Sequence, residues 1–227
     1  MSVHDGHRER MKSSFKKNGL DSMNDVNALE LLLFYAIPRR DTNVIAHALL
    51  DHFGSLSRVF SASIQELCAV EGVGENTAIL ISMIPQLVRK SMVSDAEKIT
   101  VIKNSKDAGK YLVPRFAFEQ DEVALLVCLD SQKRVIGCFE LGRGVVNKVS
   151  VDVRKVVELA LRYKASSVIL SHNHPDSFAL PSLADTAMTE QLYRSLRLVG
   201  ITLADHIIVS GEDFVSYLDS GMLVGIR

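Results

Sequence analysis

The sequence predicts a multi-domain protein of α and α/β type: an all-helical domain at residues 1–92, followed by a mixed β-sheet with flanking helices at residues 100–227. Three observations predict this fold class. Apolar residues recur at helical spacing up to about residue 92, a polar stretch follows at residues 91–100, and strand-like apolar runs then alternate with amphipathic helices. A chain of 227 residues is long enough for two domains, each with its own core.

The helical domain is predicted by apolar faces and by start and stop signals. Two of its helices have faces formed by Ala28, Leu31, Leu32 and Tyr35, and by Ile45, Ala48, Leu49 and Phe53, the second helix ending at Gly54. Ser63 followed by Glu66 is typical of a capping box that opens a short helix. Gly72 and Gly74 predict a glycine hairpin, and the next helix extends to about Lys90.

The second domain is predicted by short apolar runs separated by turn residues. Strands are expected at residues 123–129, 134–140, 145–151, 167–171, 202–209 and 214–218. Helices are expected near residues 105–112, from Asp152 onward, and from Ser182 to about Val199. Turn chemistry occurs after Asp130 and at residues 142–144. Strands mixed with amphipathic helices favour a mixed sheet with helices packed on it.

Composition and charge exclude several classes of protein. The net charge of −1 gives the whole chain no electrostatic mark of a nucleic-acid binder. The basic, polar N-terminus lacks the apolar stretch of a secretory signal, and the longest apolar runs are too short to cross a bilayer. The three cysteines have no CxxC spacing and are typical of thiols in a reducing compartment. We therefore expect a soluble, cytoplasmic protein without a membrane partner.

The segment SHNHPDSFALPSLAD, residues 171–185, allows two interpretations. In the first, a strand ends in a polar loop, and Ser182 and Asp185 then start a helix as its N-cap and first-turn acid. In the second, the same residues form a metal site. Two histidines alone would be a weak signal for metal, but a carboxylate at the start of the next helix strengthens it.

A catalytic zinc site usually has three protein ligands, drawn from His, Asp, Glu and Cys, and keeps a fourth position for water. His172 and His174 leave a strand end with their side chains on the same side. The loop of ten residues after them can return Asp185 to the same point. Ser182, one helical turn before Asp185, can donate a hydrogen bond to an oxyanion, and a carboxylate from elsewhere must act as the base.

These residues resemble a known family. The pattern His172-Asn-His174, seven residues, Ser182, two residues and Asp185 matches the JAMM motif of the JAB/MPN metallopeptidases. The surrounding sequence, with Asp205-His-Ile-Ile downstream, is similar to the bacterial RadC family, whose N-terminal helical part the segments around Phe53 and Gly72 also resemble. The resemblance covers nearly the whole chain, and its metal motif is the more specific part.

The resemblance implies a zinc-dependent hydrolase that cleaves a peptide or isopeptide bond in an unknown protein or peptide substrate. His172, His174 and Asp185 would be the zinc ligands, and Ser182 would bind the oxyanion. The motif glutamate lies immediately before an apolar strand, which here indicates Glu122 as the general base. Glu140, at the end of the next strand, is the alternative base, and Glu122 is then a solvated charge.

The sequence also departs from the RadC pattern. Members of the family usually have Pro-Ser-Gly after the second histidine, where this chain has Pro175, Asp176 and Ser177. The helix that usually starts His-Pro-Arg-Glu begins here at Asp152 as Asp-Val-Arg-Lys. These changes affect the shape of the loop and the choice of substrate, and leave the predicted ligands intact.

Other motifs have weaker support. The segment around Gly72 and Gly74 resembles a helix-hairpin-helix, whose turn can offer backbone amides to a DNA phosphate. The helical domain could instead bind a protein partner or a second copy of the chain. RadC proteins are labelled as DNA repair proteins, so the competing hypothesis is a DNA-associated binding or scaffold protein whose zinc site is structural or vestigial. His206 is interpreted as a hydrogen-bonded structural histidine.

Overall fold

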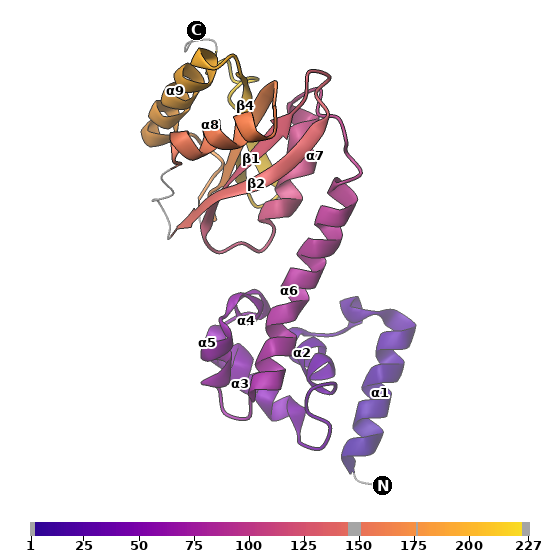
Figure 1. The fold of residues 1–227 in the computed structure, drawn as a ribbon. Helices are drawn as coiled ribbons and strands as arrows, with labels where there is room; N and C mark the ends of the chain where they lie inside the picture. The colour runs from indigo at the N-terminus through magenta and orange to yellow at the C-terminus, as the bar shows by residue number, and fades with distance from the viewer. Residues whose placement is uncertain (1–2, 145–150, 176, 224–227) are drawn as a thin grey trace. The chain divides into compact units, whose positions relative to one another are not determined.

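The computed structural model describes residues 3–144, 151–175 and 177–223, and the chain divides into two compact units, Met1–Val88 and Arg89–Arg227 (Figure 1). The division falls inside one helix, α6 (Glu75–Ala96). The sequence predicts that this helix ends near Lys90, and this prediction is wrong. The polar residues after Lys90 include no glycine or proline, so polarity alone does not end the helix.

The first unit consists of helices, several of which begin at a side-chain cap. They are α1 (Val3–Asn18), the 3-10 helix η1 (Leu20–Ser22), α2 (Asp25–Leu33), α3 (Thr42–Phe53), α4 (Leu56–Ser61), α5 (Ile64–Cys68) and the first part of α6. The predicted capping box of α5 is confirmed: Glu66 N–H donates to Ser63 Oγ, and Ser63 N–H donates to the Glu66 carboxylate. Gly54 ends α3 in the left-handed conformation, also as predicted.

The core of this unit differs in detail from the predicted apolar faces. Leu29 and Leu33 of α2 are almost completely buried in it, and they pack with Ile45 and Leu49 of α3. Tyr35, predicted to extend the face of α2, lies beyond the end of that helix and is 74% exposed. Helical spacing predicts which residues share a face, but the end of the helix at Leu33 decides which of them reach the core.

The glycine hairpin before α6 is a close-packed turn. Gly72 has φ +89°, a conformation that residues with a Cβ adopt at a cost. A Cβ at Gly72 would also lie 2.9 Å from Ile45 Cγ1. Two independent constraints therefore require glycine at this position.

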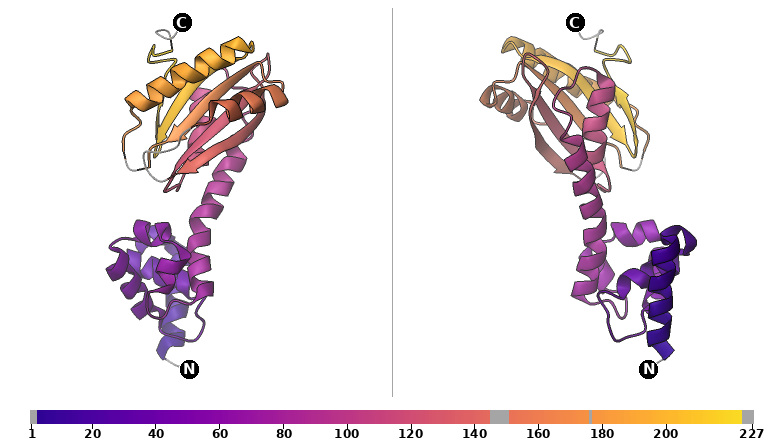
Figure 2. Two further views of the ribbon diagram at one scale, coloured as in Figure 1. Left: turned by 60° about the vertical axis from the view of Figure 1, so that its left-hand side comes forward. Right: turned by 90° about the vertical axis from the view of Figure 1, so that its right-hand side faces the viewer.

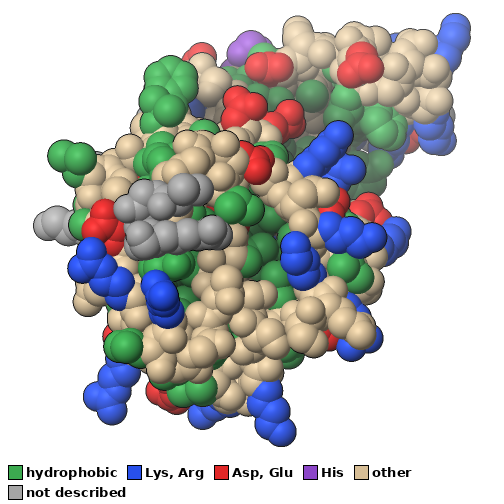
Figure 3. All heavy atoms as spheres, turned by 90° about the horizontal axis from the view of Figure 1, so that it is seen from above, with side chains coloured by type: hydrophobic (Ala, Val, Ile, Leu, Met, Phe, Trp, Pro, Cys, Tyr) green, Lys and Arg blue, Asp and Glu red, His purple; other side chains and the backbone are tan. Residues whose placement is uncertain are grey.

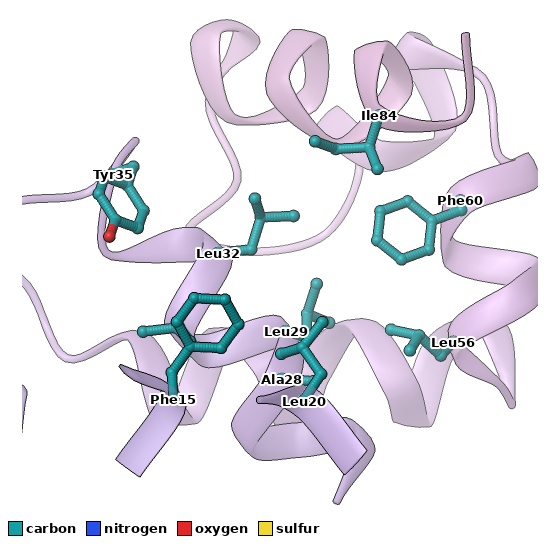
Figure 4. A pocket seen from close by; sticks show the side chains of 10 residues that line it. Phe15, Leu20, Ala28, Leu29, Leu32, Tyr35, Leu56, Phe60 and Ile84 are labelled. Carbon is teal, nitrogen blue, oxygen red and sulfur yellow. The ribbon is translucent and has the colours of Figure 1, made fainter. Parts of the chain in front are cut away.

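An apolar pocket of about 290 Å³ lies within the first unit (Figure 4). Its lining comes from α1, η1, α2, α4 and α6, and its residues are Phe15, Leu20, Ala28, Leu29, Leu31, Leu32, Tyr35, Leu56, Phe60 and Ile84. The four residues predicted to share the face of α2, namely Ala28, Leu31, Leu32 and Tyr35, therefore all line this pocket. Leu29 lines it as well, while Leu33 packs only in the core.

The second unit contains a mixed sheet. Within the described residues its strands are β1 (Glu122–Leu129), β2 (Val135–Gly144), β3 (Ser167–Asn173), β4 (Thr202–Ser210) and β5 (Asp213–Ser216), in the order β2-β1-β3-β4-β5. The pairing of β3 with β4 is parallel, and the other three pairings are antiparallel. The predicted fold class, a helical region followed by a mixed sheet with flanking helices, is confirmed.

Helices cover both faces of the sheet (Figures 1 and 2). On one face, α8 (Val153–Arg162) and α9 (Leu183–Leu198) pack through residues such as Val156 and Leu192. On the other face, α7 (Ser105–Phe116) packs through Tyr111, Leu112 and Phe116. Each core is built from alternate residues of the strands, so neighbouring residues of one strand face different helices.

The strands differ from the sequence prediction at one of the expected turns. The turn predicted at residues 142–144 is wrong: these residues continue β2 and pair with Glu122, Val123 and Ala124. The pairing skips Leu141 at a bulge, which is a common structural role for glycine-rich segments in strands. Of the strand predicted at residues 145–151, residues 145–150 lie outside the described part of the chain.

Among the helices that the structure describes, none combines the length and the apolar character needed to span a membrane.

Candidate metal centre

Strand β3 places the two histidines of the predicted site. Its apolar residues Val168 and Leu170 are fully buried against α8 and α9, so His172 and His174, which continue the same alternation, face the same side. Their Nε2 atoms lie 3.0 Å apart. His172 is buried and His174 is half-buried.

The first turn of α9 brings the predicted carboxylate to the same point. Asp185 Oδ1 lies 3.2 Å from His172 Nε2, and Asp185 Oδ2 lies 3.7 Å from His174 Nε2. Ser182 is the N-cap of α9, and its N–H and hydroxyl both donate to Asp185 Oδ2, at 2.8 and 2.6 Å. Asp185 N–H donates to Ser182 Oγ, which completes a capping box. The two interpretations of this segment are therefore compatible.

The carboxylate of Asp185 is held in its ionised form. Partial burial raises its pKa, but the adjacent His172 ring and the hydrogen bonds from Ser182 outweigh the burial and hold the pKa well below its usual value. An ionised carboxylate beside two imidazole nitrogens is a set of donors suited to a divalent cation.

The three side chains fit a zinc ion by donor type and by spacing. One donor atom from each of His172, His174 and Asp185 lies within 4.8 Å of the others. Two ligands at about 2.1 Å from a tetrahedral zinc ion are about 3.4 Å apart. The contacts of 3.0, 3.2 and 3.7 Å among the three side chains lie around this value.

The second nitrogen of each histidine has a partner, which orients the ring. His174 Nδ1 donates to the Phe178 carbonyl at 3.1 Å, because a carbonyl oxygen can only accept. A neutral His174 therefore has an unprotonated Nε2, the atom that faces Asp185. His172 Nδ1 lies 3.0 Å from His206 Nε2, and both rings are buried.

His206 extends the site into the protein interior. It lies on β4, and its Nδ1 is 2.7 Å from Thr189 Oγ1, whose hydroxyl donates to the Asp185 carbonyl at 2.5 Å. Burial lowers the pKa of His206 far below its usual value, so its ring is neutral. The aromatic ring of Tyr217 stacks on it at a centroid distance of 4.7 Å. A hydrogen-bonded structural histidine is what the sequence predicts here.

Glu122, the predicted base, lies at the start of β1 on the face of the histidines. Ala124 pairs with His172 across the antiparallel strands, and paired residues point to the same side. Two residues earlier, Glu122 therefore shares the face of His172 and His174. Its side chain is 8% exposed.

Glu140, the alternative base, lies on the other face. It pairs with Leu125, whose side chain packs in the core beneath α7. The Glu140 carboxylate is half-exposed and contacts Arg143 at 3.4 Å. The register of the sheet thus separates the two glutamates that the sequence leaves as alternatives.

Asn173, between the two histidines, is a residue that the sequence interpretation missed. Its side chain is buried, and it accepts from Val123 N–H at 2.7 Å and donates to the Asp121 carbonyl at 3.0 Å. These contacts hold the peptide groups on both sides of Glu122. The sequence offered one signal for this role: Asn173 lies between the two histidines, so its side chain faces the opposite side of the strand. Thr189 was also missed, although it lies one turn after Asp185 on α9.

Comparisons with known proteins agree with this geometry. The RadC-like JAB domain family matches residues 102–222. The UPF0758 protein FN0909 of Fusobacterium nucleatum is 34% identical over 225 residues, covering 96% of this chain and 97% of the relative. UPF0758 proteins of Shewanella loihica and Pseudoalteromonas translucida are 33% and 32% identical, covering 96% and 95% of this chain and 96% of each relative. With its helical first unit, its mixed sheet and this cluster of side chains, the chain belongs to the family of proteins with a RadC-like JAB domain.

Proposed function

We propose that this protein is a zinc-dependent hydrolase that cleaves a peptide or isopeptide bond. The observation that supports this most strongly is the convergence of His172, His174 and Asp185 on one point, with Glu122 on the same face of the sheet. Three ligands and a nearby carboxylate are the protein groups that metal-assisted hydrolysis of an amide requires. JAB domain membership agrees with this chemistry.

The three ligands would hold the ion through His172 Nε2, His174 Nε2 and a carboxylate oxygen of Asp185. A bound zinc ion would supply a Lewis acid for the substrate carbonyl and would lower the pKa of a water to about 7. The hydrogen bond from His174 to Phe178 and the bonds from Ser182 to Asp185 hold the ligands in place before any ion binds. This preorganisation reduces the entropy lost when the ion is bound.

Glu122 would move the protons. As general base it would accept a proton from the attacking water, and it would then donate that proton to the leaving amine. Asn173 fixes the backbone on both sides of Glu122, so the carboxylate starts from a defined position. General base assistance of this kind contributes about 10²- to 10⁴-fold to the rate.

Ser182 would donate to the oxyanion of the tetrahedral intermediate. Its hydroxyl donates to Asp185 in this structure, so it would have to exchange one negatively charged acceptor for another during the reaction. Ser182 is exposed, which leaves its hydroxyl accessible to a substrate.

The surface beside the ligands favours a polypeptide substrate. Between His174 and Asp185, the side chains of Phe178, Leu180 and Leu183 are 82, 65 and 93% exposed. Large apolar side chains concentrated on one short segment are typical of a binding surface. An extended peptide could bury them while its amide bond lies at the ligands.

The proposal is tested with zinc-loaded protein and a library of unstructured peptides, together with lysine-linked isopeptides. New amino termini are detected by mass spectrometry. We expect products that disappear after a chelator removes the metal and after Glu122→Gln, while that variant keeps its zinc. Absence of metal-dependent products, or full activity of Glu122→Gln, would contradict the proposal.

The alternative is a DNA-associated scaffold whose metal site is structural or vestigial. The tight turn at Gly72, in a segment that resembles a helix-hairpin-helix, favours it. Against it, Glu71 and Glu75 flank that turn, and Lys and Arg side chains are interspersed with acidic and apolar ones on the face shown in Figure 3. DNA binding should appear as affinity that falls steeply with salt. DNA binding, self-association and a cytoplasmic location stay predictions.

A further inference from the structure

A chain of buried hydrogen bonds connects two of the three proposed metal ligands, His172 and Asp185, through His206 and Thr189. It runs from His172 Nδ1 to His206 Nε2 at 3.0 Å, and from His206 Nδ1 to Thr189 Oγ1 at 2.7 Å. It ends where Thr189 donates to the backbone carbonyl of Asp185. The side chains of His206 and Thr189 have no exposed surface, so water does not compete for these contacts.

The last acceptor sets the direction of every bond in this chain. The Asp185 carbonyl can only accept, so the single hydroxyl proton of Thr189 points toward it. Thr189 Oγ1 can then only accept from His206, which requires a proton on His206 Nδ1. The ring of His206 is fully buried, and with its proton on Nδ1 it presents the lone pair of Nε2, which accepts from His172 Nδ1.

These hydrogen-bond directions determine the tautomer of His172. A neutral His172 with its proton on Nδ1 has an unprotonated Nε2, the atom that lies 3.2 Å from Asp185 and 3.0 Å from His174 Nε2. A carbonyl on α9 therefore selects the tautomer of a histidine on β3, through His206 on the neighbouring strand. The same chain ties the backbone of Asp185 to the ring of His172.

We propose that His206 and Thr189 are positioning residues that hold His172 in its metal-binding tautomer and fix its distance from Asp185. The inference rests on the metal site of the proposed function and is independent of the bond that is cleaved. Partners of this kind typically change metal affinity by about 10- to 100-fold.

The test measures zinc affinity by competition with a chelating dye, and ligand geometry by the visible spectrum of the cobalt-substituted protein. Thr189→Val keeps the volume and removes the hydroxyl, while Thr189→Ser keeps it. His206→Leu removes both polar contacts, while a glutamine in His206→Gln offers an acceptor and a donor. Thr186→Val is the matched control, because the Thr186 hydroxyl also donates to a backbone carbonyl, that of the N-cap residue Ser182, but takes no part in this series of hydrogen bonds.

We expect Thr189→Val and His206→Leu to weaken zinc binding by about 10- to 100-fold and to change the cobalt spectrum. Thr189→Ser and His206→Gln should recover most of the affinity, and Thr186→Val should bind as the unmodified protein does. In the metal-free protein, ¹⁵N NMR of the imidazoles should find His172 protonated at Nδ1, and Thr189→Val should mix the tautomers.

Two results would overturn the inference and are distinguishable. If the unmodified protein binds no zinc, the metal site itself is wrong and the proposed function fails with it. If the unmodified protein binds zinc and Thr189→Val binds it equally well with the same tautomer of His172, only the positioning role fails. Should His206→Leu fail to fold, the pair of Thr189 variants decides.

Discussion

The two faces of the β1–β3 strand pair have different tasks, although they are formed by alternate residues of the same short segments. One face presents Glu122, His172 and His174, for which we propose roles in proton transfer and metal binding. The other presents Val123 and Asn173, and Asn173 holds the backbone around Glu122. A single alternation therefore places the reactive groups on one side and their support on the other.

The largest expected effect lies on the reactive face. His172→Ala removes one of three ligands, and zinc in the purified protein should fall from about one per chain to near zero. Elemental analysis measures it. His47→Ala is the control, because His47 is an exposed histidine of the first unit. Equal zinc content in His172→Ala and the unmodified protein would show that His172 is not a metal ligand.

The second effect compares two glutamates on opposite faces. Glu122→Gln should lower the rate of any metal-dependent hydrolysis by about 10²- to 10⁴-fold with the zinc content unchanged. Glu140→Gln should leave the rate near that of the unmodified protein, because its carboxylate lies on the α7 side. The reverse result would assign the base to Glu140 and would contradict the register argument.

The third effect concerns the supporting face. Asn173→Ala leaves the buried Val123 N–H without its side-chain acceptor, so the free energy of unfolding should fall by about 1–3 kcal/mol. Urea denaturation of the metal-free protein measures it. Hydrolysis should fall more than zinc affinity does, because Asn173 holds the base and not the ligands. A loss confined to zinc affinity would place Asn173 among the ligand supports instead.

The smallest effect is a dependence on pH. The pKa of Asp185 is lower in the folded protein than in the unfolded chain, so its ionised form contributes stability above the unfolded pKa. This contribution is lost as the pH falls from the unfolded value toward the folded one. Metal-free Asp185→Asn should therefore lose less stability than the unmodified protein between neutral and strongly acidic pH. Parallel stability curves would contradict the shift.

The sequence predicts most of the fold because its signals are local. Caps at Ser63 and Ser182, the stop at Gly54 and the alternation of β1 and β3 each depend on a few neighbouring residues. The errors arise where local signals have two meanings. Residues 142–144 have the glycines of a turn but continue β2, and the polar residues after Lys90 continue α6.

The candidate site likewise has one part that local sequence predicts and another that only the folded structure reveals. The spacing of His172, His174 and Asp185 lies within one segment, so it can be recognised from sequence. The role of His206 depends on the parallel register that pairs Leu170 with His206, and no local pattern contains this register. Asn173 acts on residues about fifty positions earlier, which likewise only the folded sheet reveals.

The capping box of α9 links the start of a helix to the metal site. Asp185 Oδ2 accepts from the backbone of Ser182, while Oδ1 faces His172. Any ion that holds this carboxylate also disfavours opening of the first helical turn, by an amount set by its concentration and affinity. The amide hydrogens of Asp185 and Thr186 should therefore exchange with solvent more slowly as ions bind at the site. The exchange rate in this turn would then report the fraction of protein molecules that hold an ion.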